Sequence, residues 1–389
     1  MSLLRSFCIA FGMYSKIPMP KFEWNPKDMR YTMCFFPLVS IPIALLVLLW
    51  FYFCQWLHIH SFLFACVIAT IPVLVTGGIH LDGYCDTVDA LSSRQPREKK
   101  LEILKDPHTG AFAVLFCCLY FLLYAGFATE LAGNLYSILS LMCSFLLSRC
   151  ISGFAVVTFR SAKSSGLLHT FTDAAQKRTV AYTMIGYFIV AATLLFLIDW
   201  FVAFFALAGA LLSFLYVRIM CYRQFGGITG DIAGYLVQLC ELTTLIGITA
   251  GLLIERAVFY MKLIIGGSFQ GKSAYAAEHC SPSPIIVDGS VCTQEEILRC
   301  DILNHLHLYI RRLLEQSVSE KEIAEQIYNL CKNNPSMYIV CNELGNGVVP
   351  MEVFDRRYRE TVGRICCNIA KQAEEVIRIV CGIPIVLKK

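Results

Sequence analysis

Long apolar runs, separated by short polar segments, fill the chain between residues 34 and 254. Several of them reach the ~20 apolar residues that an α-helix needs to cross a lipid bilayer. The pattern predicts membrane-spanning helices over these ranges: 34–53, 61–76, 110–128, 135–159, 180–198, 201–217 and 236–254. The runs at 61–76 and 201–217 are short for a full crossing. We therefore predict a multi-pass α-helical membrane domain over residues 1–257.

The rest of the chain, residues 258–389, has the shorter apolar stretches of a soluble domain. Strands are predicted over 262–265, 284–289, 337–343 and 375–388, and helices over 294–316, 319–332 and 355–374. Strands that alternate with helices are typical of a parallel sheet covered by helices. The second predicted domain is thus a soluble α/β domain with a mostly parallel sheet.

The composition agrees with this division. Of 389 residues, 57% are hydrophobic and 16% are charged, whereas a soluble domain carries about 25% charged residues. The net charge of +4 gives no reason to expect nucleic acid as a partner. The 19 cysteines lack the spacing of a disulfide framework or a zinc site, which indicates reduced thiols facing a cytosol. The opening MSLLRSFCIAFGMYSKIPMP lacks a signal-peptide cleavage site and favours an interfacial amphipathic helix.

An acidic stretch, GGIHLDGYCDTVDAL, follows directly on the second apolar run. Asp82, Asp86 and Asp89 are spaced i, i+4 and i+7, which places them on one face of a helix. Three like charges repel unless a cation lies between them, and Mg²⁺ prefers carboxylate oxygens and also binds substrate phosphates. A solvated acidic loop is the alternative, but acids at a membrane boundary are costly and tend to be functional. We predict these three as catalytic metal ligands and the preceding His80 as a catalytic residue.

Other polar residues interrupt the later apolar runs. Asp231 and Glu241 lie in the glycine-rich CYRQFGGITGDIAGYLVQLCELTTL, where the glycines alone would also be explained by close helix packing. KDPHTGAF contains Asp106, and SRCISGFAVVTFRSAKSSG contains bases that suit an anionic ligand: Arg149, Arg160 and Lys163. Each base by itself could equally be a flanking residue that snorkels to the interface. We predict Asp231 as catalytic and the other five as substrate-binding.

Clustered carboxylates and nearby bases suit the transfer of a phosphate-linked group. A metal ion neutralises the charge that develops, and positioning supplies most of the remaining rate enhancement. The membrane location indicates that one substrate is amphiphilic or bulky.

Three motifs, TGGIHLDGYCDTVDAL, DPHTGAFAV and GGITGDIAGYLVQLCELTTL, resemble in their order those of the cobalamin synthase (adenosylcobinamide-GDP ribazoletransferase) family. SFCIAFGMYSKIPMP followed by FFPLVSIPIALL is similar to that family's opening, so the resemblance covers about residues 1–255. It implies that the hydroxyl of α-ribazole, or of its 5′-phosphate, attacks adenosylcobinamide-GDP. The products would be cobalamin or its phosphate and GMP, with Mg²⁺ required. The family's acidic motif falls on the three aspartates named above, and its Gly-Asp motif falls on Gly230 and Asp231.

MKLIIGGSFQGKSAYAAEHC contains a P-loop between a short predicted strand and a helix. In such a loop, backbone N–H groups cradle the phosphates, the lysine reaches the β- and γ-phosphates, and the serine binds Mg²⁺. The predicted residues for binding GTP or ATP are Gly266, Gly267, Ser268, Gly271, Lys272 and Ser273. Asp288 and Glu343 end their predicted strands at the carboxyl edge, where ligands bind in such sheets. Either could assist nucleotide or Mg²⁺ binding, or simply cap a turn.

VCNELGNGVVPMEVFDRRYRETVGRICCNIAKQAEEVIRIVCGIPIVLK, together with the P-loop, resembles adenosylcobinamide kinase / adenosylcobinamide-phosphate guanylyltransferase. That family makes the GDP-activated substrate that the membrane domain would consume. Only 27 residues (274–300) separate Ser273 from DILNHLHLYIRRLL, where the family has a longer stretch that includes the histidine that accepts GMP. His279, His305 and His307 are the candidates for that role. Three alternatives remain open: the domain has both activities, it has the kinase activity alone, or it only binds a nucleotide.

The basic residues predict how the chain lies in the membrane. They concentrate in three polar loops: Arg94, Arg97, Lys99, Lys100 and Lys105; Arg160, Lys163, Lys177 and Arg178; and Arg218 and Arg223. The positive-inside bias places these loops in the cytoplasm, and a nucleotide-binding domain is expected there too. Seven full spans would place that domain on the opposite side, so one apolar segment would have to be re-entrant or half-spanning.

Two other function classes remain open. A CDP-alcohol-type membrane phosphotransferase with a nucleotide-binding regulatory domain also carries helical aspartates, but its D-G-x-x-A-R spacing is missing after Asp82-Gly83. An NTP-driven transporter would need a second signature motif beside the P-loop. The leading hypothesis is a two-domain enzyme in a cytoplasmic membrane whose partners are its corrinoid and ribazole substrates, the lipid bilayer and other enzymes of the same pathway.

Overall fold

The computed structural model describes residues 2–20, 26–162, 176–258 and 261–388. The chain divides into two compact units, Met1–Leu253 and Ile254–Lys389. We call them the membrane unit and the P-loop unit. The division falls within the last turns of a helix, a few residues before the predicted boundary at 257.

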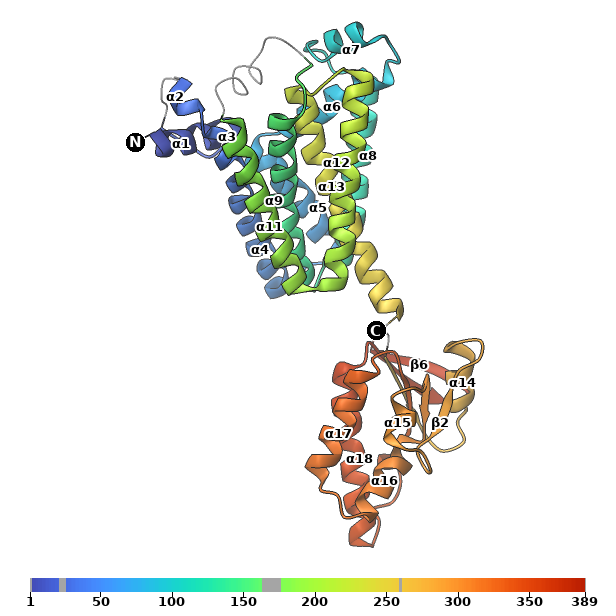
Figure 1. The fold of residues 1–389 in the computed structure, drawn as a ribbon. Helices are drawn as coiled ribbons and strands as arrows, with labels where there is room; N and C mark the ends of the chain where they lie inside the picture. The colour runs from blue at the N-terminus through green and yellow to red at the C-terminus, as the bar shows by residue number, and fades with distance from the viewer. Residues whose placement is uncertain (1, 21–25, 163–175, 259–260, 389) are drawn as a thin grey trace. The chain divides into compact units, whose positions relative to one another are not determined.

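In the described part of the membrane unit, all the named elements are helices (Figure 1). It opens with α1 (Ser2–Tyr14), α2 (Pro26–Met29), α3 (Thr32–Phe35) and the 3₁₀ turn η1 (Phe36–Val39). The first half of the bundle contains α4 (Ser40–Leu57), α5 (Ser61–Thr76), α6 (Ile79–Ser92), α7 (Arg97–Ile103) and α8 (Ala111–Ala128). After the turn η2 (Thr129–Leu131) come α9 (Leu135–Thr158), α11 (Lys177–Ile198), α12 (Trp200–Gln224) and α13 (Gly230–Val258).

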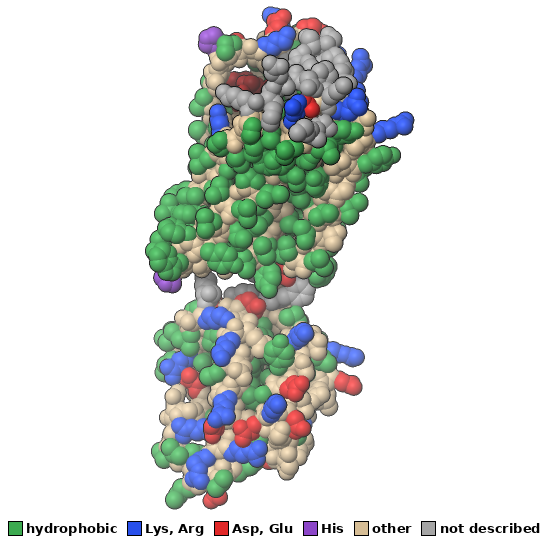
Figure 2. Space-filling view, turned by 90° about the vertical axis from the view of Figure 1, so that its left-hand side faces the viewer, with side chains coloured by type: hydrophobic (Ala, Val, Ile, Leu, Met, Phe, Trp, Pro, Cys, Tyr) green, Lys and Arg blue, Asp and Glu red, His purple; other side chains and the backbone are tan. Residues whose placement is uncertain are grey.

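Six of these helical segments are long and apolar enough to span a membrane: Thr32–Leu57, Ala111–Leu131, Leu135–Thr158, Lys177–Ile198, Trp200–Gln224 and Gly230–Glu255. Exposed hydrophobic side chains cover the sides of the bundle, as a lipid-facing surface requires (Figure 2). The short predicted run at 201–217 is part of the 25-residue α12. The run at 61–76 instead forms α5, which bends by 99° into α6. Gly77 and Gly78 make this bend because both have positive φ angles, +66° and +81°.

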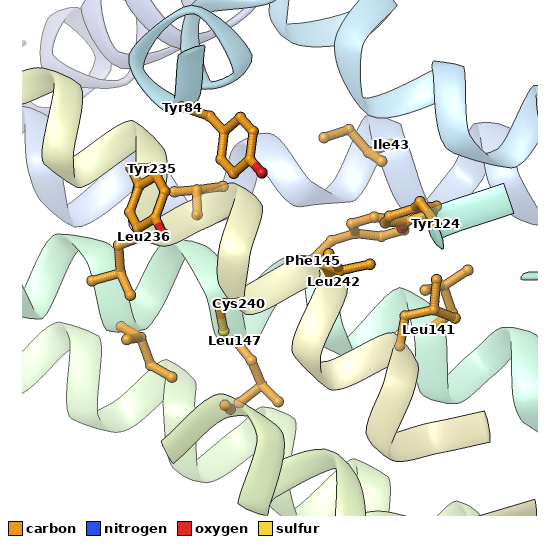
Figure 3. Packing of buried hydrophobic residues seen from close by; sticks show 14 of the residues in the cluster. Ile43, Tyr84, Tyr124, Leu141, Phe145, Leu147, Tyr235, Leu236, Cys240 and Leu242 are labelled. Carbon is orange, nitrogen blue, oxygen red and sulfur yellow. The ribbon is translucent and has the colours of Figure 1, made fainter. Parts of the chain in front are cut away.

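The interior of the bundle is packed with aliphatic and aromatic side chains (Figure 3). Small residues let the helices approach closely. A Cβ on Gly209 of α12 would lie 2.3 Å from the carbonyl oxygen of Thr243 on α13, and one on Gly247 would meet the backbone of Phe205. Such contacts are the usual basis of helix packing in a bilayer, where apolar burial contributes little.

The directions of the helices separate the two ends of the bundle. We call the end that carries α7 and the α12–α13 turn the basic end, since two of the basic loops lie there. At this end the backbone N–H of Ile228 donates to the carbonyl of Arg160 (2.8 Å). At the other end, Thr249 of α13 donates to the carbonyl of Phe127 near the end of α8 (3.3 Å). α13 starts at the basic end and finishes at the other end. This course does not support the prediction that the basic loops and the following unit both face the cytoplasm, because a helix that crosses a membrane in full has its two ends on different sides.

The P-loop unit is built on a six-stranded sheet of order β2-β3-β4-β1-β5-β6. The strands are β1 (Lys262–Gly266), β2 (Ile286–Asp288), β3 (Ile302–Asn304), β4 (Tyr338–Asn342), β5 (Glu375–Val380) and β6 (Ile383–Lys388). The first five are parallel to their neighbours, and β6 is antiparallel to β5. This confirms the predicted mostly parallel α/β sheet.

Helices cover both faces of this sheet. One face packs against α16 (Leu306–Glu315), α17 (Glu320–Asn333) and α18 (Val353–Gln372), and the other against α14 (Lys272–His279). The short α15 (Gln294–Ile297) and η3 (Leu344–Asn346) lie in connections. Two predicted elements were wrong. The helix expected over 294–316 contains β3 between α15 and α16, and the strand expected over 375–388 is a hairpin that turns at Cys381 and Gly382.

Candidate active sites

Two glycines bring α6 and α13 into contact at the basic end of the membrane unit. A Cβ on Gly83 would lie 2.7 Å from the carbonyl oxygen of Asp231, and one on Gly234 would lie 3.1 Å from the carbonyl oxygen of His80. A real side chain at Gly83 would therefore push the two helices apart. Close helix packing is the alternative explanation for such glycines. Because the packed glycines adjoin the predicted catalytic residues, both explanations apply to this contact.

A cavity of about 250 Å³ lies where these helices meet. Its wall includes Asp82 and His80 from α6, Asp231 from α13 and Ser152 from α9, and residues of α1, α3 and η1 complete it. Two carboxylates that are 149 positions apart in the sequence therefore face one space. The ring of His80 is buried against Tyr14 and Phe36, and its Nε2 has no hydrogen-bond partner among the described residues.

The other two aspartates of α6 do not line this cavity. Asp86 is half-buried one turn further along the helix. The carboxylate of Asp89 accepts the N–H groups of Gly110 (2.6 Å) and Ala113 (2.9 Å), so it caps the start of α8. Over the residues that the structure describes, no group of three or more His, Cys, Asp and Glu side chains is placed to hold a metal ion.

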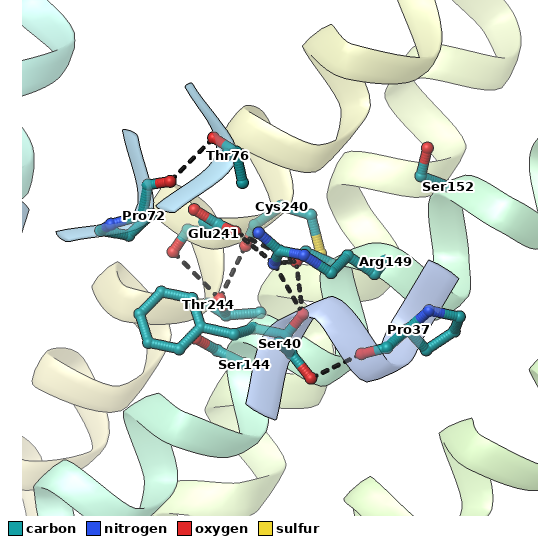
Figure 4. A network of polar contacts seen from close by, with 12 residues as sticks. Pro37, Ser40, Pro72, Thr76, Ser144, Arg149, Ser152, Cys240, Glu241 and Thr244 are labelled. Carbon is teal, nitrogen blue, oxygen red and sulfur yellow. Dashed lines mark hydrogen bonds and ion pairs between the residues drawn. The ribbon is translucent and has the colours of Figure 1, made fainter. Parts of the chain in front are cut away.

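Arg149 and Glu241 form an ion pair inside the bundle rather than lining the cavity (Figure 4). Arg149 Nη1 lies 2.7 Å from Glu241 Oε1, and both side chains are 0% exposed. Ser148 adds a weak hydrogen bond to the same carboxylate oxygen (3.4 Å). One turn from Arg149, Ser152 donates to the carbonyl of Ala233 (2.9 Å), so α9 is fixed to α13 beside the cavity.

The remaining predicted substrate-binding residues lie outside the cavity. Asp106 is exposed in the loop before α8, and it accepts the backbone N–H of His108 (2.9 Å). This hydrogen bond, together with the contact to the His108 ring, lowers the pKa of Asp106. Arg160 is exposed after α9, with its backbone fixed by Tyr222 (2.9 Å). Lys163 lies outside the described residues.

The P-loop of the second unit has the backbone conformation that its glycines permit. Gly266 has φ +151°, and a Cβ there would lie 2.4 Å from the carbonyl of Ile379. Gly271 has φ +89° and precedes the first residue of α14. Lys272 donates to the carbonyl of Gly267 (2.5 Å) across the loop, and burial lowers the pKa of its ammonium. The loop is therefore formed, with Gly267 and Ser268 between its two constrained glycines.

Polar side chains at the carboxyl edge of the sheet surround this loop. Ser273 donates to Oδ1 of Asn304 at the end of β3 (2.9 Å). Asn342, at the end of β4, donates to Ser268 (3.3 Å). Glu343 accepts a hydrogen bond from Arg378 (3.0 Å). Its side chain therefore does more than cap a turn. Asn304 could not be predicted from the sequence, because a three-residue strand is too short to show an alternating pattern.

The three candidate histidines have different surroundings. His279 is exposed at the C-terminal end of α14, where it stacks on Tyr275 and lies a helix length from the P-loop. His307 is buried, and its Nε2 lies 3.0 Å from the side-chain amide nitrogen of Asn342. Burial, with smaller contributions from His305 and Lys272, lowers the pKa of His307 to about 4.

His305 forms a dyad with Asp288. Its Nδ1 lies 2.9 Å from Asp288 Oδ2, and the residue has φ +58° directly before α16. Burial of Asp288 is outweighed by hydrogen bonds from Ser290 and His305, which together lower its pKa. Because β3 lies between β2 and β4, the dyad and Asn304 are at the same edge of the sheet as the P-loop.

The fold and these two sites define a class: an integral membrane protein with a carboxylate-lined cavity, joined to a P-loop nucleotide-binding unit. Comparison with known proteins makes the assignment specific. The cobalamin-5-phosphate synthase family matches residues 6–249, and the cobinamide kinase / cobinamide phosphate guanyltransferase family matches residues 286–387, which begin after the P-loop. The chain belongs to the cobalamin-5-phosphate synthase family through its membrane unit, fused to a cobinamide kinase/guanyltransferase domain.

Individual relatives agree with this membership. An adenosylcobinamide-GDP ribazoletransferase from Lachnoclostridium phytofermentans is 45% identical over 242 residues, which are 62% of this chain and 92% of the relative. One from Clostridium perfringens is 34% identical over 239 residues (60% and 93%). One from Treponema denticola is 31% identical over 268 residues (62% and 96%). The relatives therefore correspond to the membrane unit.

Proposed function

We propose that the chain carries out consecutive late steps of cobalamin biosynthesis. The membrane unit is an adenosylcobinamide-GDP ribazoletransferase, which joins adenosylcobinamide-GDP to α-ribazole or its 5′-phosphate and releases GMP. The observation that carries this assignment is the meeting of Asp82 and Asp231 in one cavity within the family-matched segment. The family membership also sets aside the CDP-alcohol phosphotransferase and transporter alternatives.

Asp82 and Asp231 fit a magnesium ion bound together with a pyrophosphate. Two carboxylates are a suitable protein contribution, since Mg²⁺ usually completes its coordination with substrate phosphates and water. A bound Mg²⁺ would neutralise charge on the phosphates. Asp86, on the same helix face, stays a predicted further ligand, whereas the hydrogen bonds of Asp89 favour a structural role.

The residues around the cavity position the reacting groups. The ribazole hydroxyl forms a bond to the phosphorus that carries the corrinoid, and the bond from that phosphorus to GMP breaks. His80, whose imidazole lines the cavity beside Asp82, stays the predicted residue that takes the hydroxyl proton. Exposed Arg160 at the same end, with Asp106 and Lys163 in the neighbouring loops of the sequence, would bind the substrates outside the cavity.

The assignment is tested with membranes that contain the full chain, supplied with adenosylcobinamide-GDP and α-ribazole. Asp82→Asn and Asp231→Asn are each expected to lower the rate of cobalamin and GMP formation by more than 100-fold. Asp199→Asn is the matched control, since Asp199 caps α12 at the other end of the bundle and asparagine caps equally well. Near-normal turnover by both cavity variants would contradict the proposed site.

The P-loop unit binds a nucleoside triphosphate, GTP or ATP, and belongs to the step before. Ser273, which is hydrogen-bonded to Asn304, is the P-loop residue that would bind Mg²⁺. The unit would transfer a phosphate from the bound nucleotide to the hydroxyl of adenosylcobinamide. We propose His305 as the residue that accepts GMP. Asp288 fixes its Nδ1, which leaves Nε2 to attack the α-phosphorus of GTP while pyrophosphate leaves.

Mass measurement of the chain after incubation with GTP tests the second assignment. Wild-type protein is expected to gain one guanylyl group, and His305→Asn is expected to lose it. His279→Asn, an exposed histidine of the same unit, should remain modified. A wild-type protein that phosphorylates the corrinoid but is never guanylylated would restrict this unit to the kinase step.

A further inference from the structure

The P-loop unit contains a cavity of about 910 Å³ that no step described so far uses. Its walls come from the ends of β1 and β4, from the segment 344–350 and from α18. We call it the α18 cavity. This volume is at the upper end of the range for small-molecule sites, roughly 300–1,000 Å³. A site of this size suits a ligand much bulkier than a simple alcohol.

The α18 cavity shares its walls with the nucleotide site. Ile265 and Glu343 line it, and the backbone N–H of Glu343 donates to Gly266, the first glycine of the P-loop (2.9 Å). Asn342, another lining residue, donates to Ser268 of the same loop (3.3 Å). The acceptor in phosphoryl transfer has to be held in line with the terminal phosphate of the nucleotide. The cavity therefore borders the P-loop through Asn342 and Glu343, although no residue of the loop itself lines it, and an acceptor bound there would lie beside the nucleotide.

Two arginines of α18 fix one wall of the cavity. Arg359 donates to the carbonyls of Gly345, Gly347 (3.1 Å) and Val348 (3.2 Å). Arg356 donates to Pro350 (3.2 Å) and Met351 (2.6 Å). The segment thus has a defined course although it contains no regular strand. Polar lining is supplied by Asn346, Asn368 and Arg364.

An apolar rim borders the same wall. Val348 is 94% exposed and Met351 is 92% exposed, and Val349, which lines the cavity, is also exposed. Adjacent exposed apolar side chains around a polar pocket mark a binding site more often than ordinary surface. The combination suits a ligand with a broad apolar body and amide or phosphate substituents.

We propose that the α18 cavity binds the corrinoid acceptor of the P-loop unit. Its macrocycle would lie against the rim, its amides against Asn346 and Asn368, and its hydroxyl or phosphate would point to the P-loop. This inference rests on the proposed function of the P-loop unit. It adds the place of the acceptor and the residues that select it.

Gly363 allows a direct test, because it lines the cavity on α18 and a Cβ there would have no atom within 4 Å. Gly363→Phe places a phenyl ring in the cavity and also removes a poor helix former, so the fold is expected to persist. In the full chain, it should raise the KM for adenosylcobinamide in the nucleotide-dependent step more than tenfold, with less than a twofold change in the KM for GTP. Gly363→Ala, which leaves most of the space open, should behave like the wild type.

Met351→Asp tests the rim independently and is expected to raise the corrinoid KM at least fivefold. An unchanged KM for GTP reports that the P-loop unit of each variant is folded, and turnover of supplied adenosylcobinamide-GDP reports that the membrane unit is intact. If Gly363→Phe retains the wild-type corrinoid KM, the inference is overturned. It is also overturned if Met351→Asp changes only the oligomeric state, since the rim would then be a contact between copies. If the wild type shows no nucleotide-dependent step on the corrinoid, the proposed function of the unit fails instead.

Discussion

The buried pair of Arg149 and Glu241 shows what a charged residue costs inside a bundle. Arg149 Nε and Nη2 and Glu241 Oε2 have no hydrogen-bond partner among the described residues. The pair is tolerated because each charge neutralises the other at 2.7 Å. Removing one partner leaves an uncompensated buried charge, which typically costs about 3–5 kcal/mol.

We therefore expect Glu241→Leu alone to destabilise the membrane unit by about 3–5 kcal/mol. The double variant Arg149→Met/Glu241→Leu should recover most of this loss, because it removes both charges and keeps apolar volume. Thermal unfolding of the detergent-solubilised chain measures both effects. A double variant as unstable as the single one would show that the two residues act separately.

The buried His307 makes the stability of the P-loop unit depend on pH. Its pKa falls from the ordinary value of 6.5 to about 4 in the folded chain. Between these values the unfolded chain binds a proton that the folded chain does not. The free energy of unfolding is therefore highest above pH 6.5 and falls as the pH drops towards 4.

Hydrogen exchange of peptides from this unit, measured between pH 7 and 5, is expected to show the loss of protection. His307→Gln should reduce that pH dependence, and the exposed His279→Gln should not. An unchanged pH dependence in His307→Gln would assign the effect to other groups.

Local sequence spacing can indicate a candidate site residue where the residue type alone carries the information. The glycines and lysine of the P-loop, and the acids at the strand ends, follow from local spacing, and the structure places them at one edge of the sheet. Partners across the fold could not be read in the same way. Nothing local shows that Arg149 meets Glu241, or that Asp89 faces the start of α8, because both depend on how distant helices pack.

Among the helices, α8 illustrates how a polar side chain determines where a span begins. The first N–H groups of a helix lack internal partners, and in α8 the Asp89 carboxylate accepts the N–H groups of Gly110 and Ala113. A cap of this kind contributes about 1 kcal/mol. The same residue was predicted as a metal ligand, so the two roles need separate tests.

Asp89→Ala is expected to destabilise the membrane unit by about 1 kcal/mol, whereas Asp89→Asn should keep most of both stability and ribazoletransferase activity, since its amide oxygen still accepts a hydrogen bond. Unfolding and turnover measured on the same preparations distinguish the roles. A loss of activity in Asp89→Asn as large as in Asp82→Asn would restore the metal-ligand assignment.

A helix or strand could be predicted from the sequence where its hydrophobic pattern extends over many residues. The six long apolar helices correspond to six predicted runs. The bend between α5 and α6 was not assigned from the sequence, because a short apolar run fits a tilted, broken or re-entrant helix equally well. The three residues of β3 were predicted as part of a helix, because they adjoin the strongly amphipathic α16.

For the protein as a whole, the basic loops predict that the cavity end of the bundle faces the cytoplasm. The P-loop unit needs cytoplasmic nucleotide, yet α13 ends at the opposite end of the bundle. Because α13 runs the full length of the bundle, the prediction that the basic loops are cytoplasmic and the prediction that the P-loop unit is cytoplasmic compete, and labelling decides between them.

Labelling of intact cells with a membrane-impermeant maleimide tests this orientation. The requirement for nucleotide predicts that the exposed native Cys367 and Cys381 are protected until the cells are opened, and protection of Lys99→Cys would show that the basic loops are cytoplasmic. Glu130→Cys, just after the end of α8, reports the end of the bundle at which α13 finishes. Reaction of Cys367 and Cys381 in intact cells would contradict nucleotide use by the P-loop unit.

Each unit has its own hydrophobic core, one between Met33 and Leu252 and two others between Met261 and Ile379. Neither core needs side chains from the other half of the chain to be complete. The covalent link has a further consequence, because it fixes the ratio of the two units at one to one. One translated message yields one copy of each catalyst, so a cell cannot accumulate the activating enzyme without the membrane enzyme that uses its product.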